Sequence, residues 1–304
     1  MKKNILVIGS LNYDLVVSAD HLPIPGETII GGNFKTYPGG KGANQAVAIA
    51  RMGGIVGIIG HVGQDSYGDA LISTLRKDGI DPRWISREGD EATGVAMINV
   101  DKAGQNTIVV ASGANGLVSR LQVLQAEEAF VDVGVLVMQL EIPLDAVQEG
   151  IRIARGKEIT IILNPAPALE LPVDLLSSVN YLIPNQTELL MLSGQKDVES
   201  GIEYLLKLGV ETVVVTLGGD GVVLAKDGFR KKLPAYEVDV VDTVAAGDAF
   251  VGAFAVALSE GKQLEQAAEF ASAAAAISVT RLGAQPSLPT RAEVEAFINE
   301  RKKQ

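Results

Sequence analysis

Continuous apolar runs that alternate with helical segments constrain the fold of this chain more than any other feature. The strongest runs are 5–8, 56–59, 133–138, 159–163, 181–183 and 212–216, and the helical patterns between them include 45–52, 67–77, 144–154 and 199–208. A strand that is apolar at every position is buried on both of its faces, so helices must cover both sides of the sheet. The sequence therefore predicts an α/β fold with a mostly parallel sheet between two helical layers.

Two segments leave this alternation. Residues 13–38 carry the turn-forming Pro23, Pro25 and Gly26 between short strand-like pieces, and residues 93–112 resemble a hairpin with strands at 95–100 and 107–111. We expect both segments to form a small β-sheet attached to one domain that spans residues 1–304. A sheet beside the carboxyl end of the first strand is placed to act as a lid over a ligand. A hairpin with a purely structural role fits the pattern equally well.

The composition excludes several kinds of chemistry. The 304 residues include no cysteine, which removes disulfides, thiolate nucleophiles and Cys-ligated zinc, and only two histidines, His21 and His61, which gives little support to a Ser-His-Asp triad. The formal net charge of −11 disfavours nucleic acid or an anionic membrane as a partner. No apolar stretch approaches the roughly 20 residues that span a bilayer. Asp14 interrupts the N-terminal run and no cleavage site follows, so we expect a soluble, cytoplasmic protein.

A first glycine-rich cluster follows the first β segment, as Gly39-Gly40-Lys41-Gly42-Ala43-Asn44-Gln45. It is not a Walker A loop, because Gly42 stands where Ser or Thr must follow the lysine, and it lacks the last glycine of a dinucleotide fingerprint. A turn with exposed backbone amides, a helix start, a cation and a carboxamide suits a small polyhydroxylated or anionic ligand. A structural strand-to-helix turn is the alternative.

A second cluster, Val241-Asp242-Thr243-Val244-Ala245-Ala246-Gly247-Asp248, precedes an apolar helical run. Small residues at Ala245, Ala246 and Gly247 let successive N–H groups converge at the helix start, where the macrodipole adds about half a positive charge. Such an anion hole suits the charge of a phosphoryl group in transfer. Asp248 beside it is either a base that accepts the proton of an attacking hydroxyl or a first-turn acid that stabilises the helix.

These two clusters, in this order, are similar to the two signatures of the ribokinase-like carbohydrate kinases. The resemblance covers essentially the whole chain. It extends to Gly9-Ser10-Leu11-Asn12-Tyr13-Asp14, Met138-Gln139-Leu140-Glu141, Asn164-Pro165-Ala166-Pro167, Asn185-Gln186-Thr187-Glu188 and Thr216-Leu217-Gly218. Gly113-Ala114-Asn115 and the segment 280–287 resemble the ribose-phosphorylating members in particular. The resemblance implies a three-layer α/β/α sandwich with a small β-sheet lid.

The resemblance also implies the binding residues. The sugar-binding positions are Asn12, Asp14, Gly40, Lys41, Asn44 and Glu141, with Asp248 facing the reacting hydroxyl. The ATP-binding positions are Asn185, Thr216, Gly218, Gly221, Ala246, Gly247 and Ser272, the last in place of an Asn found near the adenine in some members. Solvated surface acids are the alternative for Asp14 and Glu141, although their positions beyond strand ends favour ligand binding.

Two metal ions follow from the same resemblance. Glu188 is expected to help hold Mg²⁺ with the nucleotide, through water, although a helix-capping role beside Asn185 can coexist with it. A potassium ion is expected beside the anion hole, held mainly by carbonyl groups of Asp242, Val244, Ser278, Arg281, Gly283 and Ser287. Val244 and Ala245 replace the Thr and Gly that are frequent in the family.

The implied activity is transfer of the γ-phosphoryl group of ATP to the 5-hydroxyl of D-ribose, with Asp248 as base. Kinases of the same family that act on deoxyribose, a nucleoside or a ketose remain alternatives, as does a sugar-binding regulator without activity. A nucleoside needs stacking surface, yet aromatic residues make up only 5% of the chain. The resemblance further implies a homodimer formed through the lid.

Overall fold

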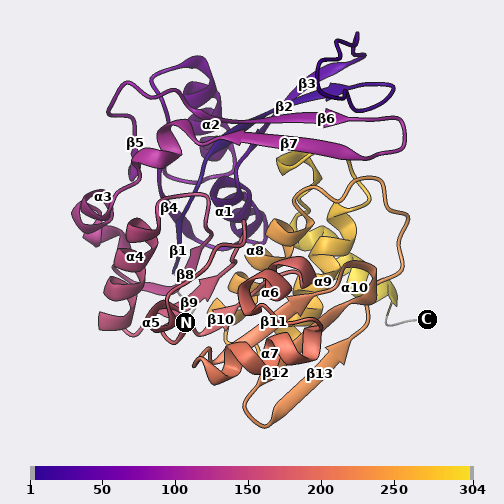
Figure 1. Ribbon diagram of the computed structural model, residues 1–304. Helices are drawn as coiled ribbons and strands as arrows, with labels where there is room; N and C mark the ends of the chain where they lie inside the picture. The colour runs from indigo at the N-terminus through magenta and orange to yellow at the C-terminus, as the bar shows by residue number, and fades with distance from the viewer. Residues whose placement is uncertain (1–3, 302–304) are drawn as a thin grey trace.

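A nine-stranded sheet forms the centre of the computed structural model, which describes residues 4–301. Its strand order is β13-β12-β11-β10-β9-β8-β1-β4-β5, with helices on both faces (Figure 1). The strands are β1 Asn4–Ile8, β4 Val56–His61, β5 Ile85–Ser86, β8 Val133–Met138, β9 Thr160–Leu163, β10 Tyr181–Leu182, β11 Thr212–Thr216, β12 Val222–Lys226 and β13 Phe229–Leu233. The predicted α/β/α sandwich with its mostly parallel sheet is confirmed. The antiparallel β12–β13 hairpin at one edge was not predicted by the alternation.

The strand β1 illustrates why both faces need helices. Ile5 and Val7 belong to one hydrophobic cluster, and Leu6 and Ile8 to the other, because successive side chains of a strand point to opposite faces. The first cluster includes residues of α1 Lys41–Arg51, α2 Ser66–Lys77, α8 Ala246–Ser259, α9 Leu264–Ser278 and α10 Arg291–Arg301. The second includes residues of α3 Arg120–Gln125, α4 Leu144–Gly156, α5 Val173–Leu176, α6 Gln186–Ser193 and α7 Val198–Lys207.

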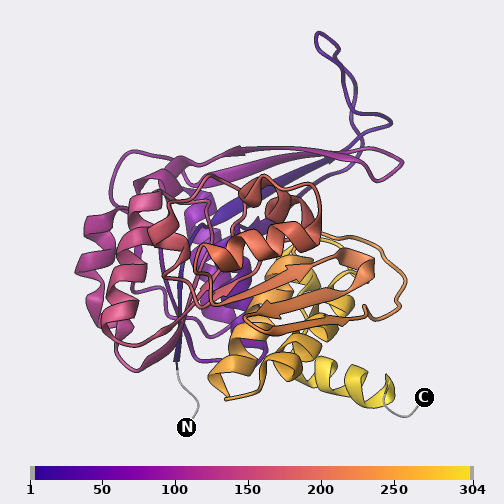
Figure 2. The ribbon, with the colours of Figure 1, turned by 60° about the horizontal axis from the view of Figure 1, so that its bottom comes forward.

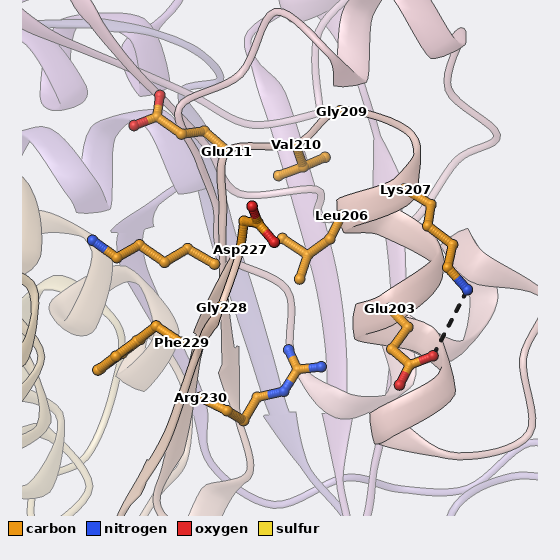
Figure 3. A pocket seen from close by; sticks show the side chains of 11 residues that line it. Glu203, Leu206, Lys207, Gly209, Val210, Glu211, Asp227, Gly228, Phe229 and Arg230 are labelled. Carbon is orange, nitrogen blue, oxygen red and sulfur yellow. Dashed lines mark ion pairs between the residues drawn. The ribbon is translucent and has the colours of Figure 1, made fainter.

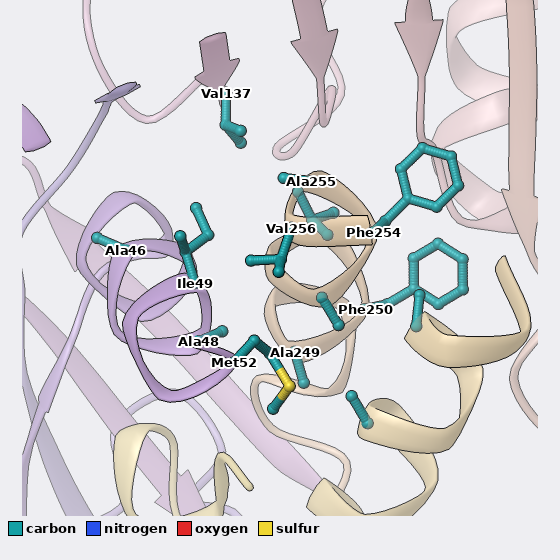
Figure 4. Packing of buried hydrophobic residues seen from close by; sticks show 14 of the residues in the cluster. Ala46, Ala48, Ile49, Met52, Val137, Ala249, Phe250, Phe254, Ala255 and Val256 are labelled. Atoms are coloured by element: carbon teal, nitrogen blue, oxygen red, sulfur yellow. The ribbon is translucent and has the colours of Figure 1, made fainter. Parts of the chain in front are cut away.

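Helices α1 and α8 lie side by side against the sheet, and this contact positions the site. Ile49 and Met52 of α1 lie beside α8 in Figure 4, where Val256 faces them. Gly252 permits the close approach, because a Cβ there would lie 2.5 Å from the Cβ of Ala48. The first turns of both helices therefore meet at one edge of the sheet.

The helix α1 begins earlier than the sequence indicated. A helix was expected from residue 45 after a flexible turn, but α1 starts at Lys41, so most of the glycine-rich cluster is helical. The amide of Ala43 donates to the Ser10 carbonyl at 2.9 Å, which ties the first turn to the end of β1. The polar residues Asn44 and Gln45 are thereby fixed on a regular helix rather than on a loop.

A second sheet of four strands, in the order β3-β2-β6-β7, crosses the end of the molecule (Figure 1). Its strands are β2 Asn12–Ser18, β3 Phe34–Gly39, β6 Gly94–Val100 and β7 Asn106–Ala111, so the predicted hairpin of 93–112 is confirmed. Strands β2 and β6 are parallel, while β2–β3 and β6–β7 are antiparallel. The loop between β2 and β3 projects from this sheet (Figure 2). Among residues 4–301, no helix has the length and apolar character needed to cross a membrane.

Candidate active site

Polar side chains gather where β1, β8 and β9 end and where α1 and α8 begin. Gln139 and Asn164 come directly after the buried strands β8 and β9, and Ser10 lies two residues beyond the end of β1. The carboxyl ends of parallel strands meet at one edge, which is where open α/β sheets bind ligands. The first turns of α1 and α8 lie at the same edge, so carboxylates, carboxamides and helix amides converge there.

Asp248 is the buried centre of this group, with 6% of its surface exposed. The carboxamide of Asn44 donates to its Oδ2 at 2.9 Å, and that of Gln45 donates to its Oδ1, also at 2.9 Å. Burial raises the pKa of Asp248 above its usual value, whereas the charge of Lys41 and these two donors oppose the rise. A carboxylate held in this way can accept a proton from a bound hydroxyl.

Lys41 provides the positive charge among four carboxylates. Burial alone would lower its pKa, but Asp248, Glu141, Glu188 and Asp14 together raise it, so Lys41 stays charged. Burial, followed by repulsion from Glu141 and Asp248, raises the pKa of Asp14 to about 7, while Lys41 lowers it. Asp14 is therefore close to its point of protonation at neutral pH.

The remaining sugar-site candidates are held by specific hydrogen bonds. Glu141 Oε2 accepts from Ser10 Oγ at 2.5 Å and from the Lys41 amide at 3.2 Å. Asn115 donates to Asn12 Oδ1 at 2.7 Å and also bonds both backbone groups of Leu11. Both contacts orient side chains that carry hydrogen-bonding groups on more than one side, as a polyhydroxylated ligand requires.

Two cavities meet at this edge and share Lys41, Ala166 and Glu188 as lining residues. One, of about 450 Å³, is bordered by Asn12 and Val110 of the small sheet and by Glu141. The other, of about 190 Å³, is bordered by Asn185, Thr216, Thr243, Ala245, Gly247 and Asp248. Some of the expected sugar-binding and nucleotide-binding residues thus border adjoining spaces, and Asp248 borders the smaller one. The expected residues Asp14, Gly40, Asn44 and Ala246 border neither cavity.

The start of α8 has the form expected of an anion hole. Ala245, at the N-cap, has φ of 61°, and Ala249 donates to its carbonyl at 2.8 Å. The amide of Ala246 reaches the Thr243 carbonyl at 3.3 Å, and the N–H groups that follow at a helix start have no partner within the helix. A Cβ on Gly247 would meet open space. Amides at this helix start are therefore free to bind an anion in the smaller cavity.

Asn185 and Glu188 form a capping box at the start of α6. Asn185 Oδ1 accepts from the Glu188 amide at 2.8 Å, and Glu188 Oε2 accepts from the Asn185 amide at 2.8 Å. Burial raises the pKa of Glu188, while the hydrogen bond from the Asn185 amide opposes the rise. The capping role considered from the sequence is thus present, and it uses only one of the two carboxylate oxygens.

The positions expected to hold potassium lie together beside α8. Asp242 accepts from the Val244 amide at 3.0 Å and from the Gly283 amide at 2.9 Å, which joins the two loops. Ser278 and Ser287 share a hydrogen bond of 2.8 Å, whereas the Arg281 side chain turns away to Glu293. No group of three or more His, Cys, Asp or Glu suited to a metal exists among residues 4–301, so any cation here would depend on backbone carbonyls.

Three ATP-site expectations lie apart from these cavities. Gly218 and Gly221 follow β11 in the turn before β12, and Ser272 lies within α9. None of the three is among the residues that border the two cavities. Their roles remain predictions.

Gln45, Gln139 and Asn164 had no role predicted from the sequence, although each lies in one of the motifs described above. Gln139 donates to Gln45 Oε1 at 2.6 Å, and Gln45 donates to Asn164 Oδ1 at 3.1 Å. The sequence did contain a sign of this role for Gln139 and Asn164. A carboxamide directly after a fully apolar strand is buried near the strand end and therefore needs a hydrogen-bond partner.

A larger cavity, of about 670 Å³, lies at the opposite end of β11 (Figure 3). It is bordered by the end of α7 and by the β12–β13 turn, through Glu203, Lys207, Asp227 and Arg230 among others. Its charged side chains are exposed, and Lys207 pairs with Glu203 at 3.8 Å. By volume alone, this cavity would be chosen as the active site. The buried titratable groups, however, lie at the carboxyl end of the strands, and we therefore place the active site there.

Comparisons with known proteins show which family the chain belongs to. The signature of the pfkB family carbohydrate kinases matches residues 2–291. The ribokinase of Haemophilus influenzae is 42% identical over 303 residues, which cover 98% of this chain and 99% of that protein. The deoxyribokinase of Salmonella typhi is 34% identical over 302 residues, with coverage of 97% and 99%.

Solved structures are equally similar. The ribokinase of Thermotoga maritima superposes with a TM-score of 0.90 at 43% identity, over 98% of this chain and 99% of that one. The ribokinase of Arabidopsis thaliana, solved with ribose and ATP, has a TM-score of 0.92 at 33% identity, with the same coverage. Both similarities extend over nearly the full length of this protein.

Proposed function

The chain belongs to the pfkB family of carbohydrate kinases, and we propose that it transfers the γ-phosphoryl group of ATP to the 5-hydroxyl of D-ribose. The observation that carries this proposal is Asp248, which is buried beside the smaller of two adjoining cavities and has both carboxylate oxygens held by carboxamide donors. The similarity of the whole chain to ribokinases supports ribose as the acceptor.

In this mechanism the sugar occupies the larger of the two cavities. Asn12, Lys41 and Glu141, which border this cavity, bind its hydroxyls. Asp14 and Asn44, whose Oδ1 is buried and unpartnered, are assigned to the same sugar from the family resemblance. Asp248 accepts the proton of the 5-hydroxyl as the new O–P bond forms and the bond to the leaving ADP oxygen breaks. The amides at Ala245, Ala246 and Gly247 stabilise the charge on the transferred group.

The nucleotide lies in the smaller cavity, near Asn185 and Thr216. Glu188 fits a role in holding Mg²⁺ through water, since its Oε2 alone is used in the capping box and its side chain borders both cavities. Magnesium bound with ATP neutralises phosphate charge. A monovalent cation beside the Asp242 loop would add to the positive potential there, through carbonyl ligands.

The first experiment measures ribose-dependent ADP release by the wild type and by Asp248→Asn. We expect turnover to fall by about 10²–10⁴-fold, because the variant lacks the base but keeps the cavity. Asp227→Asn, in the β12–β13 turn, is the matched control and should keep normal turnover. Near-normal turnover of Asp248→Asn would remove this residue from the role of base.

A second experiment compares rates in potassium and in a large inert cation such as tetramethylammonium. Faster turnover in potassium is expected, because the two loops joined by Asp242 present carbonyl groups beside the anion hole. Equal rates would contradict the proposed potassium site.

The similarity to a deoxyribokinase makes deoxyribose the second candidate acceptor. A nucleoside is less suited to the small sheet, because Tyr13 stacks on Tyr67 with ring centres 4.7 Å apart and the Tyr37 ring lies against Gly283. A panel of ribose, deoxyribose, fructose and adenosine, with ADP release as readout, distinguishes these acceptors. Binding of ribose in a calorimeter without any turnover would instead indicate a regulator.

A cytoplasmic homodimer formed through the small sheet completes the proposal. Every residue of β7 is exposed, including Ile108 and Val110, which point to the same face, at 50% and 45%. Exposed apolar side chains of this kind favour burial of the strand against a second protein molecule. Sedimentation velocity of the wild type and Ile108→Glu tests it, and a wild type that sediments as a monomer at micromolar concentration would contradict it.

A further inference from the structure

The two carboxylate oxygens of Asp248 are held by carboxamides that must face it in one orientation. An ionised carboxylate only accepts hydrogen bonds, so Asn44 and Gln45 must both present their NH₂ groups. For Gln45 this leaves the carbonyl oxygen Oε1 pointing away from Asp248. Something on the far side must then select this orientation over the flipped one.

Gln139 makes that selection. Its Nε2 donates to Gln45 Oε1 at 2.6 Å, and the side chains of Gln45 and Gln139 are fully buried. Asn164 Oδ1 accepts from the same Gln45 NH₂ group at 3.1 Å, while Asn164 donates to the Ile183 carbonyl at 2.9 Å, which fixes its own orientation. If Gln45 flipped, its NH₂ group would face the NH₂ group of Gln139 and its oxygen would face the Asp248 carboxylate.

The far end of this series of hydrogen bonds has no further partner among residues 4–301. Gln139 Oε1 is buried without a hydrogen-bond partner, and a Cβ on Gly9 would lie 2.1 Å from it. The glycine therefore leaves room for the oxygen, and the Gln139 NH₂ group faces Gln45. We call Gln139, Gln45 and Asp248 the carboxamide relay.

We propose that Gln139, acting through Gln45, keeps Asp248 ionised at neutral pH. The inference rests on the proposed function, in which Asp248 is the base. Gln45 and Gln139 are positioning residues, since neither borders the two cavities. Protonated Asp248 would lose one of its two donors, so the relay opposes proton uptake before the reaction.

The charged groups around Asp248 act alongside the relay. Lys41 on α1 favours the ionised form and Glu141 after β8 opposes it, while Asp14 on β2 and Glu188 on α6 are also coupled to Asp248. None of these groups touches Gln139 through a hydrogen bond that the structure records in residues 4–301. Substitution of Gln139 with an uncharged residue thus changes the donors without changing the charges.

The test compares Gln45→Met and Gln139→Met, which keep side-chain length but lose the carboxamide. The Asp248 carboxyl carbon is titrated by NMR in the unliganded protein, and kcat is measured against pH at saturating ribose and MgATP. Loss of the direct donor should move the titration midpoint and the acid limb of kcat upward by about one pH unit, and loss of Gln139 by about half a unit. Above the limb, kcat should stay within about twofold of the wild type, and Gln139→Met should add nothing in a Gln45→Met background.

Gln122→Met is the matched control, because this glutamine also donates one hydrogen bond, at 2.7 Å to the Gly60 carbonyl, away from Asp248. This substitution should leave the acid limb of the kcat profile at the same pH as in the wild type. A titration midpoint unchanged in both relay variants, or an equal loss of kcat at every pH, would overturn the inference. Gln139→Asn, too short to reach Gln45, gives the same test if the Met variant does not fold. The NMR midpoint decides the inference even if ribose proves not to be the acceptor, whereas ADP release decides the proposed function.

Discussion

The two ends of β11 carry cavities of opposite character. At the carboxyl end, cavities of about 190 and 450 Å³ share Lys41 as a lining residue, and the smaller one is bordered by Asp248, which is 6% exposed. At the amino end, the cavity of about 670 Å³ is bordered by Lys207 and Glu203, whose side chains are 78% and 56% exposed. Exposed charges are solvated and screened, whereas buried charges alter one another's protonation. The difference shows that burial of ionisable groups, more than cavity size, indicates where chemistry takes place.

The strongest test of this difference is to replace one lysine at each end of β11. Lys41→Met leaves four carboxylates without their common cation, so we expect kcat/KM to fall by about 10³-fold, or about 4 kcal/mol. Lys207→Met removes half of an exposed pair and should change the free energy of unfolding by less than about 0.5 kcal/mol, with normal kcat/KM. Steady-state kinetics and urea unfolding measure both. Equal effects at the two ends would refute the contrast.

A pH experiment sharpens the same contrast. The folded protein raises the pKa of Asp14 from 3.8 to about 7, so between these values the folded state keeps a proton that the unfolded state has lost. This contribution to stability is fully present below pH 3.8 and is lost as the pH rises through about 7. Asp14→Asn should therefore remove about 3 kcal/mol of the loss in stability between pH 4 and 8.

Urea unfolding at several pH values provides the measurement, with Asp227→Asn at the opposite cavity as control. The control should keep the pH dependence of the wild type. If Asp14→Asn kept it as well, the burial of Asp14 would not be responsible for the slope.

The smallest expected effects come from backbone conformation. Ala245 at the active-site edge has φ of 61°, a region that favours glycine, and Gly228 in the opposite turn has φ of 65°. Ala245→Gly should raise the free energy of unfolding by about 1 kcal/mol, and Gly228→Ala should lower it by about 1 kcal/mol. Thermal unfolding with ADP release checks both. A destabilised Ala245→Gly would mean that the alanine methyl makes a contact worth more than the strain.

The fold was largely predictable from the apolar runs. Runs such as 133–138 and 212–216 coincide with β8 and β11. A strand buried on both faces must be apolar at every position, so such runs are visible in the sequence. The start of α1 at Lys41 was not predictable, since glycines at 39, 40 and 42 favour a turn by local preference. The tie between Ala43 and Ser10 overrides that preference, and it exists only once β1 is in place.

The site was predictable in its acids and less so in its carboxamides. Glu141 follows β8 as expected, whereas Asp14 was expected beyond a strand end and instead lies within β2. The family resemblance assigned both acids to one site with Lys41, and in the structure both raise the pKa of Lys41. Gln139 and Asn164 carry no charge, and what they do depends on partners from other strands and helices. Hydrogen-bond direction across three segments of chain is a property of the folded arrangement, which no local pattern encodes.

The position of β1 within the central sheet determines when the protein can fold. This first strand pairs with β4 on one side and with β8 on the other, and Ile5 lies opposite Val135. During synthesis the earliest strand must therefore wait until nearly half of the chain has left the ribosome before its second neighbour exists. Until then one long edge of β1 stays unpaired, and such edges recruit chaperones or other nascent chains. A protein with this strand order should depend on the pace of translation more than one built from consecutive hairpins.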